Sequence, residues 1–182
     1  HRTAEHVGAA LGIGAGEVAV CSTGLIGERL PTDRLLSGID AAIAGLSVDG
    51  GADAATAIMT TDSVPKTAEA ARAGWWVGGM AKGAGMLAPS LATMLVVVTT
   101  DAVADAATLD KALRAATRVT FDRVDSDGCT STNDTVLLLA SGASGVTPAY
   151  ADLEAAVTEV CASLARQLVG DAEGASKDVR IE

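Results

Sequence analysis

Residues 82–101 read KGAGMLAPSLATMLVVVTTD, and this stretch joins a small-residue segment to the clearest strand pattern of the chain. Glycine, alanine and serine are frequent in its first part, which ends at Ala92 and Thr93. The apolar run over residues 94–100 is rich in valine and threonine, and it predicts a β-strand. Thr93 therefore lies at the entrance of a predicted strand, eleven residues after Lys82.

The pattern on either side of this stretch mixes helices and strands. Apolar residues at helical spacing predict helices over residues 3–11, 107–119 and 150–169, and a further helix after Pro31 with Thr32 as its N-cap. Short apolar runs predict strands over residues 17–22, 57–61, 75–80, 94–100 and 136–140. Strict βαβ alternation, as in a dinucleotide-binding domain, is not seen. We therefore expect an α/β layered sandwich.

Composition excludes several classes of function. The 182 residues suit one domain, and a hydrophobic content of 49% argues against disorder. A net charge of -10 argues against a nucleic-acid partner or an anionic membrane surface. Three widely spaced cysteines form no disulfide framework, which favours a cytoplasmic protein. Because the chain begins at His1 and stops in a strand-like segment, we interpret it as a piece of a longer protein.

Two other motifs have simpler interpretations. The glycines of LGIGAGE, residues 11–17, follow a predicted helix and precede a predicted strand, the reverse of a dinucleotide-binding turn. The segment RVDSDGCTSTND, residues 123–134, nearly matches a calcium loop. Arg123, however, occupies the first position, where a carboxylate is needed. The histidines and cysteines lack metal-ligand spacing, so no metal site is predicted.

The position of Thr93 suggests a catalytic role for its hydroxyl group. If the Ala92–Thr93 bond were cut, Thr93 would gain an α-amine with a pKa near 8, partly neutral at cellular pH. That amine could act as the base for the hydroxyl of the same residue. The small Ala92 leaves the preceding carbonyl open to attack by the threonine oxygen. The alternative is a threonine that only begins a β-strand.

The residues around Thr93 resemble a known family. The stretch KGAGMLAPSLATML is similar to the self-cleavage segment of the glutamate N-acetyltransferase/ornithine acetyltransferase family of arginine biosynthesis, with an actinobacterial character. Four more segments resemble that family's motifs in the same order: STGLIGERLP at 22–31, AIMTTDSVPK at 57–66, DGCTSTNDTV at 127–136 and DAEGASK at 171–177. The resemblance implies an incomplete α-β-β-α layered sandwich, like that of DmpA and the ornithine acetyltransferases.

The resemblance also implies roles for individual residues. Thr93 would be both the cleavage residue, after Ala92, and the nucleophile that carries the acetyl group. Thr23 and Gly24 would form the oxyanion hole, where a hydroxyl and an N–H stabilise developing negative charge. The implied substrate-binding residues are Thr60, Lys82, Thr93 and Glu173. Opposite charges at Lys82 and Glu173 suit an amino-acid substrate, which also carries both.

The implied reaction is acetyl transfer from N-acetylornithine to glutamate, with no metal or organic cofactor and with acetyl-CoA as a second donor in some members. Residues 1–92 would belong to the α chain and residues 93–182 to the β chain of one precursor. Together they would form a catalytic-core fragment of a cytoplasmic α2β2 or larger assembly. The residues themselves leave two alternatives open. One is a self-processing aminopeptidase or amidohydrolase with water as acceptor, and the other is a non-catalytic binding or assembly module.

Overall fold

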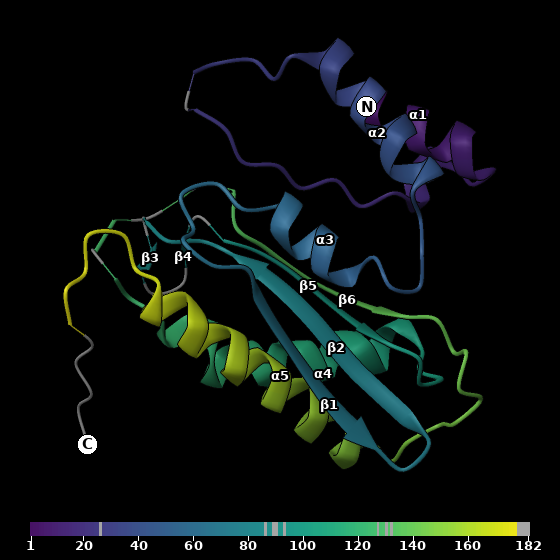
Figure 1. Cartoon of the computed structure of the whole chain (residues 1–182). Helices are drawn as coiled ribbons and strands as arrows, with labels where there is room; N and C mark the ends of the chain where they lie inside the picture. The colour runs from purple at the N-terminus through teal and green to yellow at the C-terminus, as the bar shows by residue number, and fades with distance from the viewer. Residues whose placement is uncertain are drawn as a thin grey trace. The chain divides into compact units, whose positions relative to one another are not determined.

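The computed structural model describes the chain except for residues 26, 86, 89–90, 93, 127, 130, 132 and 178–182 (Figure 1). The chain forms two compact units, residues 1–51 and residues 52–182. The first unit contains helix α1 (Arg2–Leu11), the short 3-10 helix η1 (Ala15–Glu17) and helix α2 (Thr32–Ala44). Gly12 caps the C-terminus of helix α1, and its φ of 71° is the left-handed conformation that glycine adopts at little cost. His6 of α1 contacts Asp40 of α2 at 2.6 Å.

The second unit is built on a four-stranded sheet with the order β1-β2-β5-β6. Its strands are β1 (Lys66–Arg72), β2 (Trp75–Lys82), β5 (Leu95–Thr100) and β6 (Thr135–Ala140). Strands β1, β2 and β5 pair antiparallel, and β6 lies parallel to β5. A parallel neighbour needs a crossover connection, and helix α4 (Ala106–Val119) lies within it. A two-stranded hairpin, β3 (Leu87–Ala88) with β4 (Leu91–Ala92), precedes β5.

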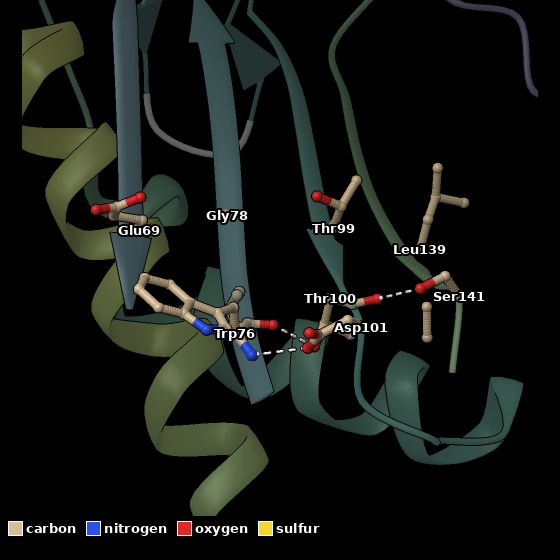
Figure 2. Close-up of a pocket in the computed structure, with 10 residues that line it drawn as sticks. Glu69, Trp76, Gly78, Thr99, Thr100, Asp101, Leu139 and Ser141 are labelled. Carbon is tan, nitrogen blue, oxygen red and sulfur yellow. Dashed lines mark hydrogen bonds between the residues drawn. The ribbon is translucent and has the colours of Figure 1, made fainter. Parts of the chain in front are cut away.

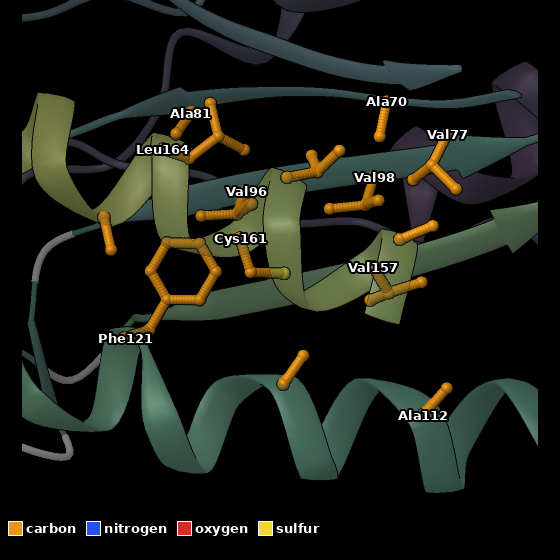
Figure 3. Packing of buried hydrophobic residues seen from close by; sticks show 14 of the residues in the cluster. Ala70, Val77, Ala81, Val96, Val98, Ala112, Phe121, Val157, Cys161 and Leu164 are labelled. Carbon is orange, nitrogen blue, oxygen red and sulfur yellow. The ribbon is translucent and has the colours of Figure 1, made fainter. Parts of the chain in front are cut away.

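Two helices cover one face of this sheet, α4 and the long helix α5 (Tyr150–Gly170) (Figure 1). Figure 3 shows their side chains meeting those of β2 and β5 in a continuous apolar core. Small residues such as Ala112, Ala116 and Ala156 are fully buried there, which lets the two helices approach each other closely. Phe121, from the 3-10 helix η2 (Phe121–Arg123), fills one end of the core. The opposite face of the sheet leaves Trp76 and Leu139 about half exposed.

Most of the predicted elements are present, at nearly the predicted positions. The strands predicted over 75–80, 94–100 and 136–140 correspond to β2, β5 and β6. The helices predicted over 3–11, 107–119 and 150–169 correspond to α1, α4 and α5. Helix α2 follows Pro31 as predicted, but Pro31 holds the cap position and Thr32 is the first helical residue. Mixed α/β architecture is therefore confirmed.

Two predicted strands are wrong. Residues 57–61 follow helix α3 (Gly51–Ala57), and the N–H groups of Ile58 and Met59 bond back to carbonyls of that helix. Alanine favours the helix here, and Asp53 in the first turn complements its dipole. Glu17 lies in η1, where its carboxylate accepts the N–H of Gly14 at 2.7 Å. Residues 18–22 pair with no strand in the described part of the chain, and strand propensity without a partner forms no sheet.

A glycine in β2 allows close packing of α5 on the sheet. A Cβ atom at Gly79 would lie 3.0 Å from Cγ1 of Val160 and 3.1 Å from Cδ1 of Leu164. We expect Gly79→Val to lower the free energy of unfolding by about 1–3 kcal/mol, because the added carbons displace α5. Gly170→Ala is the control, since a Cβ there meets nothing within 4 Å. Equal thermal stability of both variants would contradict this account of the packing.

Candidate active site

The candidate site lies at the end of β2 that neighbours the start of β5. Lys82 is the last residue of β2 and pairs in register with Leu95, the first residue of β5. The side chain of Lys82 is buried. Ala92 ends the short strand β4, and Thr93 lies outside the described residues. The register therefore places Lys82 opposite a residue only two positions after the predicted nucleophile.

A buried lysine close to this end of the sheet, Lys66, joins two aspartates from distant parts of the chain. Its ammonium nitrogen donates to Oδ1 of Asp62 at 2.7 Å and to Oδ2 of Asp171 at 2.5 Å. A third hydrogen bond of 3.3 Å goes to the carbonyl of Val64. The side chains of Lys66 and Asp62 are 0% and 1% exposed, and that of Asp171 is 10% exposed. All three donors of the ammonium group are thus used inside the protein.

Both aspartates are held in the charged form. Burial alone would raise the pKa of Asp171, but hydrogen bonds from Lys66 and Ser63 outweigh burial and lower the pKa to about 2. Burial also opposes ionisation of Asp62, yet hydrogen bonds from the N–H of Gly83 and from Lys66 lower the pKa of this carboxyl below its ordinary value. The cluster therefore carries one positive and two negative charges at neutral pH. Backbone N–H groups that donate to the two carboxylates stabilise the additional negative charge.

Asp62 connects the segment before β1 to the segment after β2. Its Oδ1 accepts the N–H of Gly83 at 2.6 Å, and Gly83 directly follows Lys82. Its Oδ2 accepts the N–H of Thr60 at 3.1 Å. One buried carboxylate therefore links Thr60 to Gly83, the residue directly after Lys82.

The segment after α5 is attached to the same place. Asp171 accepts hydrogen bonds from the hydroxyl and, at 2.9 Å, from the N–H of Ser63. Two residues later, Glu173 donates its N–H to the carbonyl of Ala84 at 2.5 Å. The carboxylate of Glu173 lies against Gly85, where a Cβ atom would come within 2.8 Å of Oε2. The structure thus brings the Glu173 segment beside the loop that follows β2, at the α5 end near β3 and β4 in Figure 1.

A third aspartate holds the chain beside the predicted nucleophile. The N–H of Met94 donates to Oδ1 of Asp134 at 3.0 Å, and the N–H of Thr135 donates to the carbonyl of Met94 at 3.1 Å. Asp134 belongs to the segment over residues 127–136 that carries part of the family resemblance. The described residues of that segment therefore lie beside the start of β5.

The predicted oxyanion-hole residues lie in the other unit. Thr23 is half-buried and Gly24 is exposed, in an irregular segment between η1 and α2. A Cβ atom at Gly24 would make an ordinary contact, 3.4 Å, with Leu30. Their role as an oxyanion hole for Thr93 stays a prediction, as does substrate binding by Lys82 and Glu173.

Asp62, Lys66 and Asp171 were not among the predicted site residues. Asp62 and Lys66 are both within the segment over residues 57–66, and Asp171 opens the segment over residues 171–177. Their presence in two of the resembling segments was the available signal. Burial of the lysine could not be read from its spacing, because its partner Asp171 is 105 positions away.

A separate hollow of about 500 Å³ lies on the open face of the sheet (Figure 2). Trp76, Thr99 and Leu139 are among its lining residues, and the N–H of Trp76 donates to Asp101 at its edge at 2.7 Å. Trp76 is six positions before Lys82 along β2, which is about 20 Å in a strand. The hollow is therefore remote from the candidate site.

Neither a metal centre nor a membrane span is evident in the part of the chain that the structure describes. No three histidine, cysteine, aspartate or glutamate side chains there are grouped so that they could hold a metal ion. None of the described helices has both the length and the apolar character needed to cross a membrane.

The protein is therefore of the mixed α/β class, with two helices on one face of its sheet and a buried network of charged residues at one end of that sheet. The ArgJ family profile matches residues 1–182. The chain is 67% identical over 182 residues to the arginine biosynthesis bifunctional protein ArgJ of Streptomyces coelicolor, covering 100% of this chain and 48% of that protein. The ArgJ protein of Thermobifida fusca is 62% identical over 180 residues, covering 99% of this chain and 47% of its own length.

This chain belongs to the ArgJ family. The resemblance to the enzymes of arginine biosynthesis, including its actinobacterial character, is thereby confirmed. A third relative, the arginine biosynthesis bifunctional protein ArgJ of Mycobacterium leprae, is 63% identical over 189 residues. The chain spans about half the length of the curated relatives it matches.

Proposed function

We propose that this chain is part of an acyltransferase that moves an acetyl group from N-acetylornithine to glutamate. The observation that carries the proposal is the network around Lys66, which gathers the Thr60, Lys82 and Glu173 segments at the end of the sheet where Thr93 precedes β5. Family membership supports it, because the relatives are named for arginine biosynthesis. Acetyl-CoA is a second donor that fits the same chemistry.

The proposed reaction begins with attack of the Thr93 hydroxyl on the carbonyl carbon of Ala92, which breaks the C–N bond and forms an ester. Water then hydrolyses this ester, leaving a carboxylate on Ala92 and a free hydroxyl and α-amine on Thr93. The free α-amine of Thr93 then takes the proton of its own hydroxyl, and the oxygen attacks the acetyl carbonyl of N-acetylornithine. Thr23 and Gly24 donate hydrogen bonds to the tetrahedral oxyanion. Ornithine leaves with the proton, and the amine of glutamate attacks the acetyl-threonine ester, which restores the hydroxyl. No step of this route requires a metal or an organic cofactor.

Charge supports the proposed binding residues. The buried ammonium group of Lys82 would pair with the α-carboxylate of the substrate in a site of low dielectric, where such a pair is strong. The carboxylate of Glu173 would receive the substrate's amine. One site can accept ornithine and glutamate in turn because both carry the same α-carboxylate.

The proposed assembly follows from cleavage at Ala92. Residues 1–92 would end the α chain and residues 93–182 would begin the β chain, both in one catalytic core. Strands β2 and β5 come from opposite sides of that cut and pair antiparallel, so the two chains would remain joined by a sheet. The family resemblance leads us to propose that these chains form a cytoplasmic α2β2 or larger assembly.

The open face of the sheet supports the finer fold assignment. Trp76 and Leu139 are 51% and 50% exposed there, and the hollow of Figure 2 lies between them. Large apolar side chains on a sheet face are stabilised by burial against a second layer. We propose that a second sheet packs on this face to complete an α-β-β-α sandwich.

Kinetics of the full-length protein test the proposed function. We expect a burst of ornithine from N-acetylornithine that continues as steady turnover only when glutamate is present. Steady turnover without glutamate would instead indicate a hydrolase with water as acceptor. No burst under either condition would contradict covalent catalysis.

Glu173→Gln tests the proposed role of the carboxylate. We expect its KM for N-acetylornithine to rise by about 30-fold or more, because losing one partner of a desolvated charge pair costs about 2–5 kcal/mol. Self-cleavage involves no external substrate, so intact-mass measurement should show normal processing. Wild-type KM and kcat in this variant would remove Glu173 from the site.

A further inference from the structure

We propose that Lys66 is a positioning residue whose buried ammonium group fixes the spacing of three segments, residues 60–63, 83–85 and 171–173. This inference rests on the proposed function, since these segments carry or directly follow Thr60, Lys82 and Glu173. The side chain of Lys66 is 0% exposed, so it acts through neighbouring groups and not by touching a substrate.

Three hydrogen bonds form a ring around Lys66, and each joins two of the segments. The N–H of Gly83 binds Asp62, the N–H of Ser63 binds Asp171, and the N–H of Glu173 binds the carbonyl of Ala84. Lys66 lies at the centre of this ring and donates to both aspartates. A displacement of either carboxylate would therefore be transmitted to the loop after β2 and to the segment after α5.

The charges explain why the centre of the ring must be a cation. One oxygen of Asp62 and one of Asp171 lie within 2.7 Å of the same nitrogen. Without the ammonium group, the buried carboxylate of Asp62 and the 10% exposed carboxylate of Asp171 would face each other at short range and repel, and the pair would separate or take up a proton. Either change alters the distance between the segments that the carboxylates hold.

The experiment replaces Lys66 with methionine, an unbranched apolar side chain, in the full-length protein. We expect amide hydrogen exchange to become about tenfold faster or more in peptides covering 83–85 and 171–173, because both segments lose a fixed anchor. The KM for N-acetylornithine should rise by about tenfold or more with a smaller change in kcat, because displaced binding groups weaken substrate binding. Lys111→Met is the matched control: Lys111 is exposed on α4, 4.0 Å from the ring centroid of Tyr150.

A second substitution separates positioning from general stability. Adding Asp171→Asn to Lys66→Met removes one of the two facing charges and allows the new amide to donate a hydrogen bond to Asp62. The KM of this double variant should therefore be at least about threefold lower than that of Lys66→Met alone. A purely structural lysine would lower kcat through loss of active protein and leave KM unchanged, and that result overturns the proposal. Unchanged hydrogen exchange in both segments also overturns it.

Asp171→Asn alone keeps the test decisive if the methionine variant does not fold. Lys66 then keeps its ion pair with Asp62, so faster hydrogen exchange should be confined mainly to residues 171–173. Hydrogen exchange at the wild-type rate in those residues would overturn the proposal. A wild-type protein without acetyl transfer would refute the proposed function instead. The exchange rates would then decide whether Lys66 positions the segments.

Discussion

Replacing Thr93 with alanine in the full-length protein is expected to abolish both cleavage after Ala92 and acetyl transfer. One hydroxyl performs both attacks in the proposed mechanism, so its loss removes the nucleophile from two reactions at once. We expect kcat to fall by at least about 10⁴-fold, the scale seen when a catalytic nucleophile is removed.

Intact-mass measurement and a glutamate acetylation assay check this expectation. The alanine variant should yield a single uncut chain, whereas wild type yields two. Thr93→Ser is the control, because it retains a hydroxyl and should retain measurable cleavage and transfer. Two chains from the alanine variant would show that another group cuts the bond. An uncut wild-type protein after long incubation would favour a non-catalytic module.

The sequence predicts those elements whose stability depends on their own pattern. All residues of β5 after Leu95 are β-branched, and α5 repeats apolar residues at helical spacing, so burial and local preference agree. The strand β1 could not be predicted, because KTAEAAR contains residues that do not favour strands. It forms because all seven residues pair with β2 across a turn at Gly74, whose φ is 84°.

Part of the candidate site could also be predicted from sequence. The resembling segments nominate Lys82 and Glu173, and the structure brings their segments together through the bond between Glu173 and Ala84. The ring around Lys66 could not be predicted, because it depends on long-range contacts and on burial. Nothing in the spacing of Asp62 and Lys66 distinguishes a buried ion pair from a solvent-exposed one. Whether a charged residue forms a buried ion pair can therefore be decided only once the fold is known.

Asp62 offers the largest expected effect on stability. Its side chain is 1% exposed and accepts hydrogen bonds from Lys66, Gly83 and Thr60. Asp62→Ala would leave buried donors unsatisfied and would remove one of the two charges that neutralise Lys66. We expect the free energy of unfolding to fall by about 3–5 kcal/mol at pH 7, the usual cost of breaking a buried ion pair by removing one partner.

Chemical denaturation followed by circular dichroism measures this loss, and its pH dependence identifies the cause. The pKa of Asp62 is lowered in the folded protein, so its contribution is complete above the ordinary carboxyl pKa of about 4. The contribution is lost as the pH falls below that value toward the lowered pKa, because the carboxyl of the unfolded chain then binds a proton that the folded protein does not yet bind. The difference between wild type and Asp62→Ala should therefore shrink between pH 5 and pH 3, roughly the range over which the free carboxyl titrates. Asp62→Asn keeps one oxygen acceptor and should lose less stability than the alanine variant. An alanine variant within about 1 kcal/mol of wild type at pH 7 would show that water or a rearranged side chain satisfies these donors.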